Sequence, residues 1–189
     1  SEGFYGAAVR TTVRQGEALY IVVPSERFVV ETVETIAKTD GRAAEVVEPA
    51  LDALSPGSPL RAAAVMASEA AGLARIQEAG WPDAETGERE VTVDHDTRNA
   101  AIMLAYETGA FSRYGEILPE GDRWRPRFVQ RLGDLPEGEI AQLSALREYQ
   151  ARLTALDSVA RAQVQLAPAE RGVEVRDILV SLTPAPRHV

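Results

Sequence analysis

The sequence lacks cysteine altogether and holds only two histidines, His95 and His188. Without cysteine the chain forms no disulfide, and it offers neither thiolate ligands for zinc nor a cysteine nucleophile. A metal site would have to combine one internal histidine with scattered carboxylates, so we expect no metal and no cofactor. A single lysine and a single asparagine among many arginines and alanines follow GC-rich codon usage and indicate a bacterial or phage origin.

Long apolar runs are also missing. The longest, ALYIVV at 18–23, has the length of a strand, whereas a membrane-spanning helix needs roughly 20 apolar residues. The first residues, SEGFYGAAVR, lack the basic and apolar regions of a secretion signal. We therefore expect a soluble chain with no membrane span, from which any targeting segment was removed or in which it was never present, and a cytoplasmic or virion-associated location.

The charge of the chain limits its partners. The formal net charge is −9, and hydrophobic residues make up 45% of the sequence, which describes an acidic but otherwise ordinary globular chain. The electrostatic field of this negative charge repels polyanions, so nucleic acid is disfavoured as a partner. Other protein subunits are the expected partners, in a homo-oligomer or a hetero-oligomer.

The apolar pattern predicts more helix than strand. Strands are predicted over 16–24, 89–95 and 172–184, and helices over 25–38, 42–54, 60–80, 96–109 and 138–167. For 25–38 a strand over 28–33 stays open as the alternative, because β-branched residues crowd this segment. The predicted fold class is α+β and mainly helical: a helix bundle with a small sheet of about three short strands and one long C-terminal amphipathic helix.

The length of 189 residues fits a single globular domain over 1–189. Glycine and proline punctuate the stretch from Ser112 to Pro136, so we expect an irregular arm at about 112–136. A short tail at 184–189 ends the chain. No internal repeat is apparent.

Asp94, His95 and Asp96 end the alternating stretch REVTVDH at 89–95. Histidine and carboxylates at a strand end are suited to general-base or metal chemistry. A zinc or iron site needs three or four ligands, however, and neighbours in a strand point to opposite faces. The favoured interpretation is a boundary, at which Asp96 or Thr97 caps the next helix and the aspartates meet its dipole.

A basic island, RWRPRFVQR at 123–131, interrupts the acidic chain. Arginine interleaved with aromatic residues stacks on bases or grips phosphate, but arginine and tryptophan are also enriched at protein interfaces. The apolar stripe of the long final helix is a second candidate interface, as an oligomerisation seam, although packing in the core of a single domain is favoured for it. The predicted interface residues are Arg123, Trp124, Arg125, Arg127, Phe128, Tyr149, Leu153 and Leu156.

These observations favour a non-catalytic protein-interaction or structural assembly subunit of a larger complex, such as a virion-type or scaffold assembly. The sequence holds no phosphate loop, no nucleophile elbow and no dinucleotide fingerprint. The first alternative is an enzyme or small-ligand sensor that uses Asp94, His95 and Asp96. The second is a nucleic-acid-binding regulator that uses Arg123 to Arg131.

Overall fold

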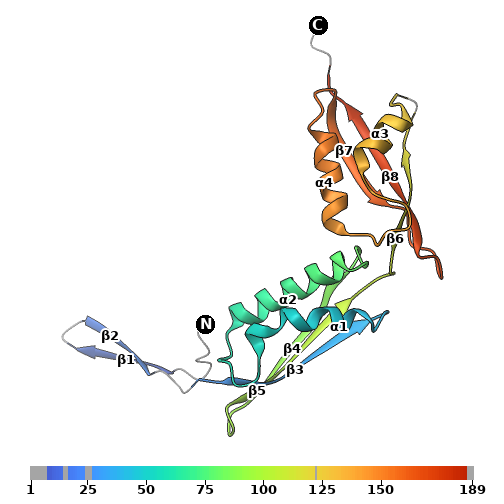
Figure 1. Ribbon diagram of the computed structural model, residues 1–189. Helices are drawn as coiled ribbons and strands as arrows, with labels where there is room; N and C mark the ends of the chain where they lie inside the picture. The colour runs from blue at the N-terminus through green and yellow to red at the C-terminus, as the bar shows by residue number, and fades with distance from the viewer. Residues whose placement is uncertain (1–7, 15–16, 24–26, 122, 187–189) are drawn as a thin grey trace. The chain divides into compact units, whose positions relative to one another are not determined.

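The computed structural model describes the chain except for residues 1–7, 15–16, 24–26, 122 and 187–189 (Figure 1). By its contacts the chain divides into two compact units. The first unit comprises residues 1–75 and 85–107, and the second comprises residues 76–84 and 108–189. The expectation of one globular domain over 1–189 stays a prediction.

The first unit is built on a three-stranded sheet with the order β3-β5-β4. Strand β3 runs parallel to β5, and β4 runs antiparallel to it. Two helices follow the first strand and lie on one face of the sheet (Figure 1). The elements are β3 (Val29–Lys38), α1 (Ala43–Val47), the short 3-10 helices η1 (Glu48–Ala50) and η2 (Asp52–Leu54), α2 (Ala62–Glu78), β4 (Glu85–Asp94) and β5 (Asn99–Glu107). A separate hairpin of β1 (Ala8–Arg14) and β2 (Glu17–Val23) precedes them.

The second unit repeats this topology. Its sheet has the order β6-β8-β7, with β6 parallel and β7 antiparallel to the central strand β8. The elements are β6 (Arg113–Pro119), α3 (Pro126–Gly133), α4 (Leu143–Thr154), β7 (Val159–Leu166) and β8 (Val175–Pro184). Each unit is therefore a β-α-α-β-β module in which the last strand fills the centre of the sheet, although the sequence shows no repeat.

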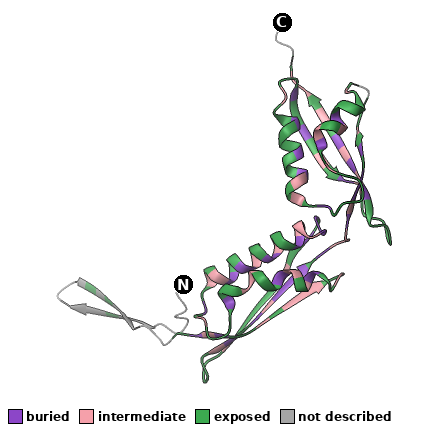
Figure 2. Cartoon of the chain, in the orientation of Figure 1, coloured by how far each residue is buried: buried purple, intermediate pink, exposed green. Residues whose placement is uncertain are grey.

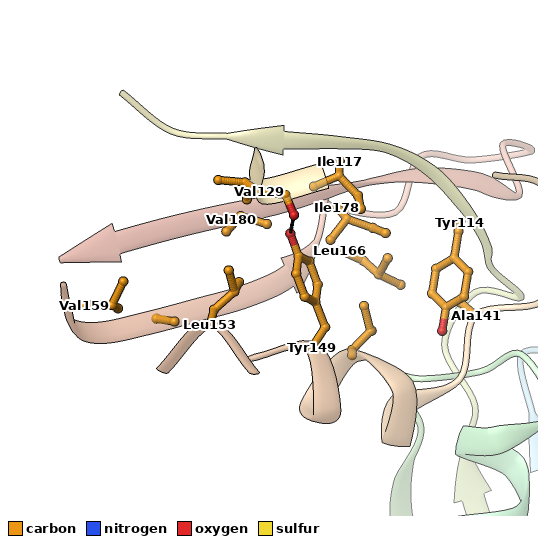
Figure 3. Close-up of a cluster of buried hydrophobic side chains, with 12 residues drawn as sticks. Tyr114, Ile117, Val129, Ala141, Tyr149, Leu153, Val159, Leu166, Ile178 and Val180 are labelled. Carbon is orange, nitrogen blue, oxygen red and sulfur yellow. Dashed lines mark hydrogen bonds between the residues drawn. The ribbon is translucent and has the colours of Figure 1, made fainter. Parts of the chain in front are cut away.

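The core of each unit lies between the helices and one face of the sheet (Figure 2). In the first unit the central strand β5 contributes the buried side chains of Ile102, Leu104 and Tyr106. In the second unit Tyr149 of α4 reaches across the core, and its hydroxyl donates a hydrogen bond of 2.8 Å to the carbonyl oxygen of Val129 (Figure 3). The sheet and its helices thus form two layers around each core.

The predicted mainly helical bundle is wrong. The described residues form eight strands and four α-helices, and both three-stranded sheets are mixed. Segment 25–38 was expected to be a helix, but β3 occupies most of it, in line with the strand alternative. Segment 96–109 holds β5, which has a neighbour on each side and is therefore apolar almost throughout, a pattern that resembles a buried helix.

Two further expectations about the C-terminal half are corrected. The segment expected to be irregular, 112–136, contains β6 and α3. The long helix expected over 138–167 is two elements, because α4 ends at Thr154 and β7 begins at Val159. In β7 apolar Ala162, Val164 and Leu166 alternate with polar side chains, which is the strand period of two. At the C-terminus, β8 ends at Pro184, and residues 187–189 lie outside the described part.

Candidate binding groove

Backbone hydrogen bonds from loops cover the first residues of the outer edges of β3 and β6. At the start of β3, the Val30 N–H donates to the carbonyl oxygen of Ser58 at 2.9 Å, and the Gly57 N–H donates to that of Val30 at 2.8 Å. At the start of β6, the Tyr114 N–H donates to the carbonyl oxygen of Glu139 at 2.9 Å. Such cover blocks an edge strand from pairing with another chain.

The other two edge strands, β4 and β7, each pair antiparallel with the central strand of their sheet. They differ in whether a hydrogen bond closes the outer edge. A side chain partly closes the outer edge of β7, because the Val164 N–H donates to Oε1 of Gln150 on α4 at 3.1 Å. The side-chain amide takes the place that a peptide carbonyl of an added strand would occupy. Strand β4 pairs with β5 alone, and within the described chain no side-chain or loop hydrogen bond closes its outer edge. Its edge is therefore open to another strand.

An apolar groove of about 400 Å³ runs beside this open edge, between β4 and the first half of α2. The odd-numbered side chains of β4 face the helix because side chains alternate along a strand. Met66 and Val91 are 58% and 40% exposed, respectively, although both are large and apolar. The lining residues are Leu60, Ala62, Val65, Met66, Arg89, Val91, Val93 and His95.

Polar and aromatic contacts bound the groove. Arg89 Nη1 lies 2.7 Å from Glu69 Oε2, so this ion pair ties β4 to α2. At the turn, the His95 ring meets the Phe28 ring edge to face, with 5.2 Å between the centroids. The groove therefore offers an apolar floor with few polar groups, which suits apolar side chains better than a polar small molecule.

The structure does not bring the side chains of Asp94, His95 and Asp96 together at one site. They lie at the turn between β4 and β5, so the helix boundary expected here is wrong. Oδ1 of Asp94 accepts hydrogen bonds from the N–H groups of Asp96 at 2.8 Å and Thr97 at 3.3 Å, and these bonds hold the pKa of Asp94 below its ordinary value. His95 turns to the groove instead. Within the described chain, no group of three or more histidines and carboxylates is placed to hold a metal, and the catalytic alternative stays a prediction.

The equivalent groove of the second unit, beside β7, is smaller and more polar. It measures about 280 Å³, and Asp83, Arg147, Gln150 and Gln165 contribute to its walls. Gln150 also bonds to the edge of β7. The second unit therefore lacks both the open strand edge and the predominantly apolar groove of the first unit. The two modules share a topology but differ at the corresponding edge.

The arginine-aromatic segment lies in the second unit, partly on α3. Arg123, Arg125 and Arg127 are exposed, and Phe128 is 45% exposed. Trp124 packs against the core instead, and its buried indole N–H finds no acceptor within the described residues. The segment thus presents arginines around one exposed phenylalanine, and its role at an interface stays a prediction.

The predicted interface residues of α4 and of the turn after it lie in or against the core of their own unit. Tyr149 and Leu153 are fully buried, and Leu156 packs against the same cluster. Their role at an interface also stays a prediction. The groove residues Met66, Val91 and Val93 were not among the predicted site residues. The alternation of REVTVDH did place Val91 and Val93 on one face, but only the sheet order shows that this face adjoins a free edge.

Comparisons with known proteins identify the fold. Crystal structures of Haemophilus influenzae BamA POTRA3-5 and of Haemophilus ducreyi BamA lacking POTRA domains 1–3 are similar, with TM-scores of 0.60 and 0.66 and sequence identities of 16% and 14%. The first match covers 96% of this chain and 74% of that chain, and the second covers 84% and 30%. No family model and no curated protein matches the chain. In the described part, no helix has both the length and the apolar character needed to cross a membrane. The two units accordingly have the fold of POTRA modules.

Proposed function

We propose that this chain is a non-catalytic protein-interaction module that binds an extended segment of another protein along β4. The observation that carries the proposal is the open edge of β4 next to the apolar groove. An added strand gains main-chain hydrogen bonds from the edge and inserts alternate side chains into the groove. Among the edges of the two three-stranded sheets, the other three are at least partly closed by Ser58, Glu139 or Gln150, so β4 is the most open of these edges for a partner.

The fold supports the same role. POTRA modules of BamA and Omp85 are protein-interaction and assembly modules, and those of known proteins are periplasmic. We therefore propose a periplasmic module of an assembly protein, in place of the cytoplasmic or virion-associated chain expected from the sequence. The arginine-aromatic segment of α3 remains a second protein-contact surface in this proposal, because Phe128 is exposed among arginines.

Replacing Met66 by glutamate tests the groove. We expect the Met66→Glu variant to bind a fluorescent peptide of alternating valine and threonine at least about tenfold more weakly than the unmodified chain, because burying a methionine side chain contributes about 1.5–3 kcal/mol. Fluorescence anisotropy measures the dissociation constant. Met66 is exposed, so the fold tolerates the change.

Leu118→Glu supplies the matched control, because Leu118 is 37% exposed on β6 of the second unit. This variant introduces the same charge and should bind the peptide normally.

Disulfide formation tests whether the peptide pairs with the edge of β4, since the chain has no cysteine of its own. A peptide with one cysteine should cross-link to Thr92→Cys on β4 and not to Thr32→Cys on β3. Equal cross-linking at both strands, or unchanged binding by Met66→Glu, would contradict the proposal.

A further inference from the structure

We infer that the segment bound along β4 alternates apolar residues with basic residues. The inference rests on the proposed function, because it concerns the two faces that a strand added to β4 would meet. One face is the apolar groove with α2. The other is the outer face of the sheet, and its charge decides the second half of the pattern.

The outer face of β4 is acidic. Glu90 and Thr92 lie on it together, since the Thr92 hydroxyl donates to Oε1 of Glu90 at 3.3 Å. Asp94 follows two residues later on the same face, and Glu88 stands exposed in the bulge between Thr86 and Arg89. The one basic residue of β4, Arg89, belongs to the groove and pairs with Glu69. The described outer face of this strand therefore carries carboxylates and no base.

The neighbouring strands extend this acidic character. Glu90 is in register with Met103 of β5, and Met103 is in register with Glu34 of β3. Glu34 is exposed, and Met103 is half-buried between the two carboxylates. The base nearest to this face along β3 is Lys38, which lies at the far end of the strand and pairs with Glu107 at 2.9 Å. A strand next to β4 thus meets negative charge at its outward positions.

A bound strand presents its side chains alternately to the two faces. Directly opposite side chains on paired strands have Cβ atoms about 4.5–5.5 Å apart, where opposite charges stabilise the pair and like charges destabilise it. Apolar residues at every second position fill the groove, and lysine or arginine at the intervening positions faces Glu90 and its acidic neighbours. A segment with glutamate or aspartate at those positions would be rejected.

Three labelled peptides of equal length test this pattern: valine alternating with lysine, with threonine or with glutamate. We expect the lysine peptide to bind at least about tenfold more tightly than the glutamate peptide, with the threonine peptide in between, because two or three cross-strand pairs each change affinity a few-fold. A fourth peptide has the composition of the first but with its lysines clustered at one end. It should bind more weakly than the alternating peptide, although its charge is the same.

Paired protein variants separate a local effect from the net charge of −9. Glu88→Gln with Glu90→Gln should reduce the preference for lysine over glutamate by at least half. Glu45→Gln with Glu48→Gln removes the same charge from exposed positions of α1 and η1 and should leave the preference unchanged. An equal loss in both double variants would overturn the inference, because total charge would then explain the preference.

The outcomes also distinguish the two proposals. If all alternating peptides bind equally and Met66→Glu weakens each of them, the groove binds extended segments but the basic pattern is wrong. If Met66→Glu weakens none of them, the proposed function fails and the inference fails with it. Weaker binding of every alternating peptide by Met66→Glu, together with a preference for lysine that depends on Glu88 and Glu90, supports both.

Discussion

The carboxylate of Asp94 stabilises the turn between β4 and β5. It accepts hydrogen bonds from the N–H groups of Asp96 and Thr97. Because both bonds favour the charged form, they hold the pKa of Asp94 below its ordinary value. Arg98 completes the turn with a positive φ of 59°, a conformation that non-glycine residues adopt infrequently.

This lowered pKa predicts how the turn responds to acid. The folded pKa lies below the unfolded value, so the contribution of Asp94 to stability is complete above the unfolded pKa of about 3.9. It is lost as the pH falls through the lower, folded pKa. In NMR titrations, we expect the amide signals of Asp96 and Thr97 to move with that lower pKa. Asp94→Asn keeps an acceptor without the charge, so its turn should show no such transition; a titration of Asp94 at the ordinary value would contradict this account.

Among the elements, α2 packs against β5 at a glycine. A Cβ atom on Gly72 would lie 2.9 Å from Cγ1 of Val47 and closer still to the hydroxyl oxygen of Tyr106. That hydroxyl donates to the carbonyl oxygen of Glu69 at 3.2 Å, and burial raises the pKa of Tyr106 to about 12. Helix and sheet therefore approach each other closely where a side chain is absent.

Gly72→Ala should lower the free energy of unfolding by up to about 2 kcal/mol, because an overpacking cost of about 1–3 kcal/mol outweighs the gain in helix propensity of about 1 kcal/mol. Urea denaturation measures the change. Tyr106→Phe removes the nearest atom, so Gly72→Ala should cost less in that background. An equal cost in both backgrounds would show that the hydroxyl is not the obstacle.

The sequence predicted some elements because their signals are local. Strand β4 alternates, β8 follows a turn, and the helix expected at 60–80 corresponds to α2. Strand β5 was mistaken for a helix because its apolar run reflects two neighbouring strands, which lie elsewhere in the sequence. Strand β7 continued the apolar spacing of α4, although its own alternation at Ala162, Val164 and Leu166 was visible. The turn at Asp157 and Ser158 was the missed boundary.

The candidate groove was predictable only in part, for the same reason. The alternation places Val91 and Val93 on one face, but the open edge depends on which strand lies beside β4. Likewise, the hydrogen bond that closes the edge of β7 joins Gln150 to Val164, which are separated in the sequence by the end of a helix and a turn. Long-range pairing therefore decides where the site lies, and a local pattern does not contain it.

On the scale of the whole molecule, two modules of one topology carry different edges. The first leaves β4 open beside an apolar groove, and the second closes β7 with Gln150. Packing between the helices and the sheet fixes the layers that the two modules share. The exposed residues at the strand edges can differ without disturbing the core, so the two modules can differ in what they bind.

The same division into two units predicts how the chain unfolds. Both tryptophans, Trp81 and Trp124, belong to the second unit, so tryptophan fluorescence reports on that unit, whereas far-UV circular dichroism reports on both. We expect Leu153→Ala, in the second core, to cost about 2–5 kcal/mol and to lower the fluorescence transition. Ile102→Ala, in the first core, should lower part of the dichroism transition and leave fluorescence unchanged. If Ile102→Ala shifts the fluorescence transition as much as Leu153→Ala does, the chain unfolds as the single domain that the sequence predicted, because a cooperative unit cannot lose one core and retain the other.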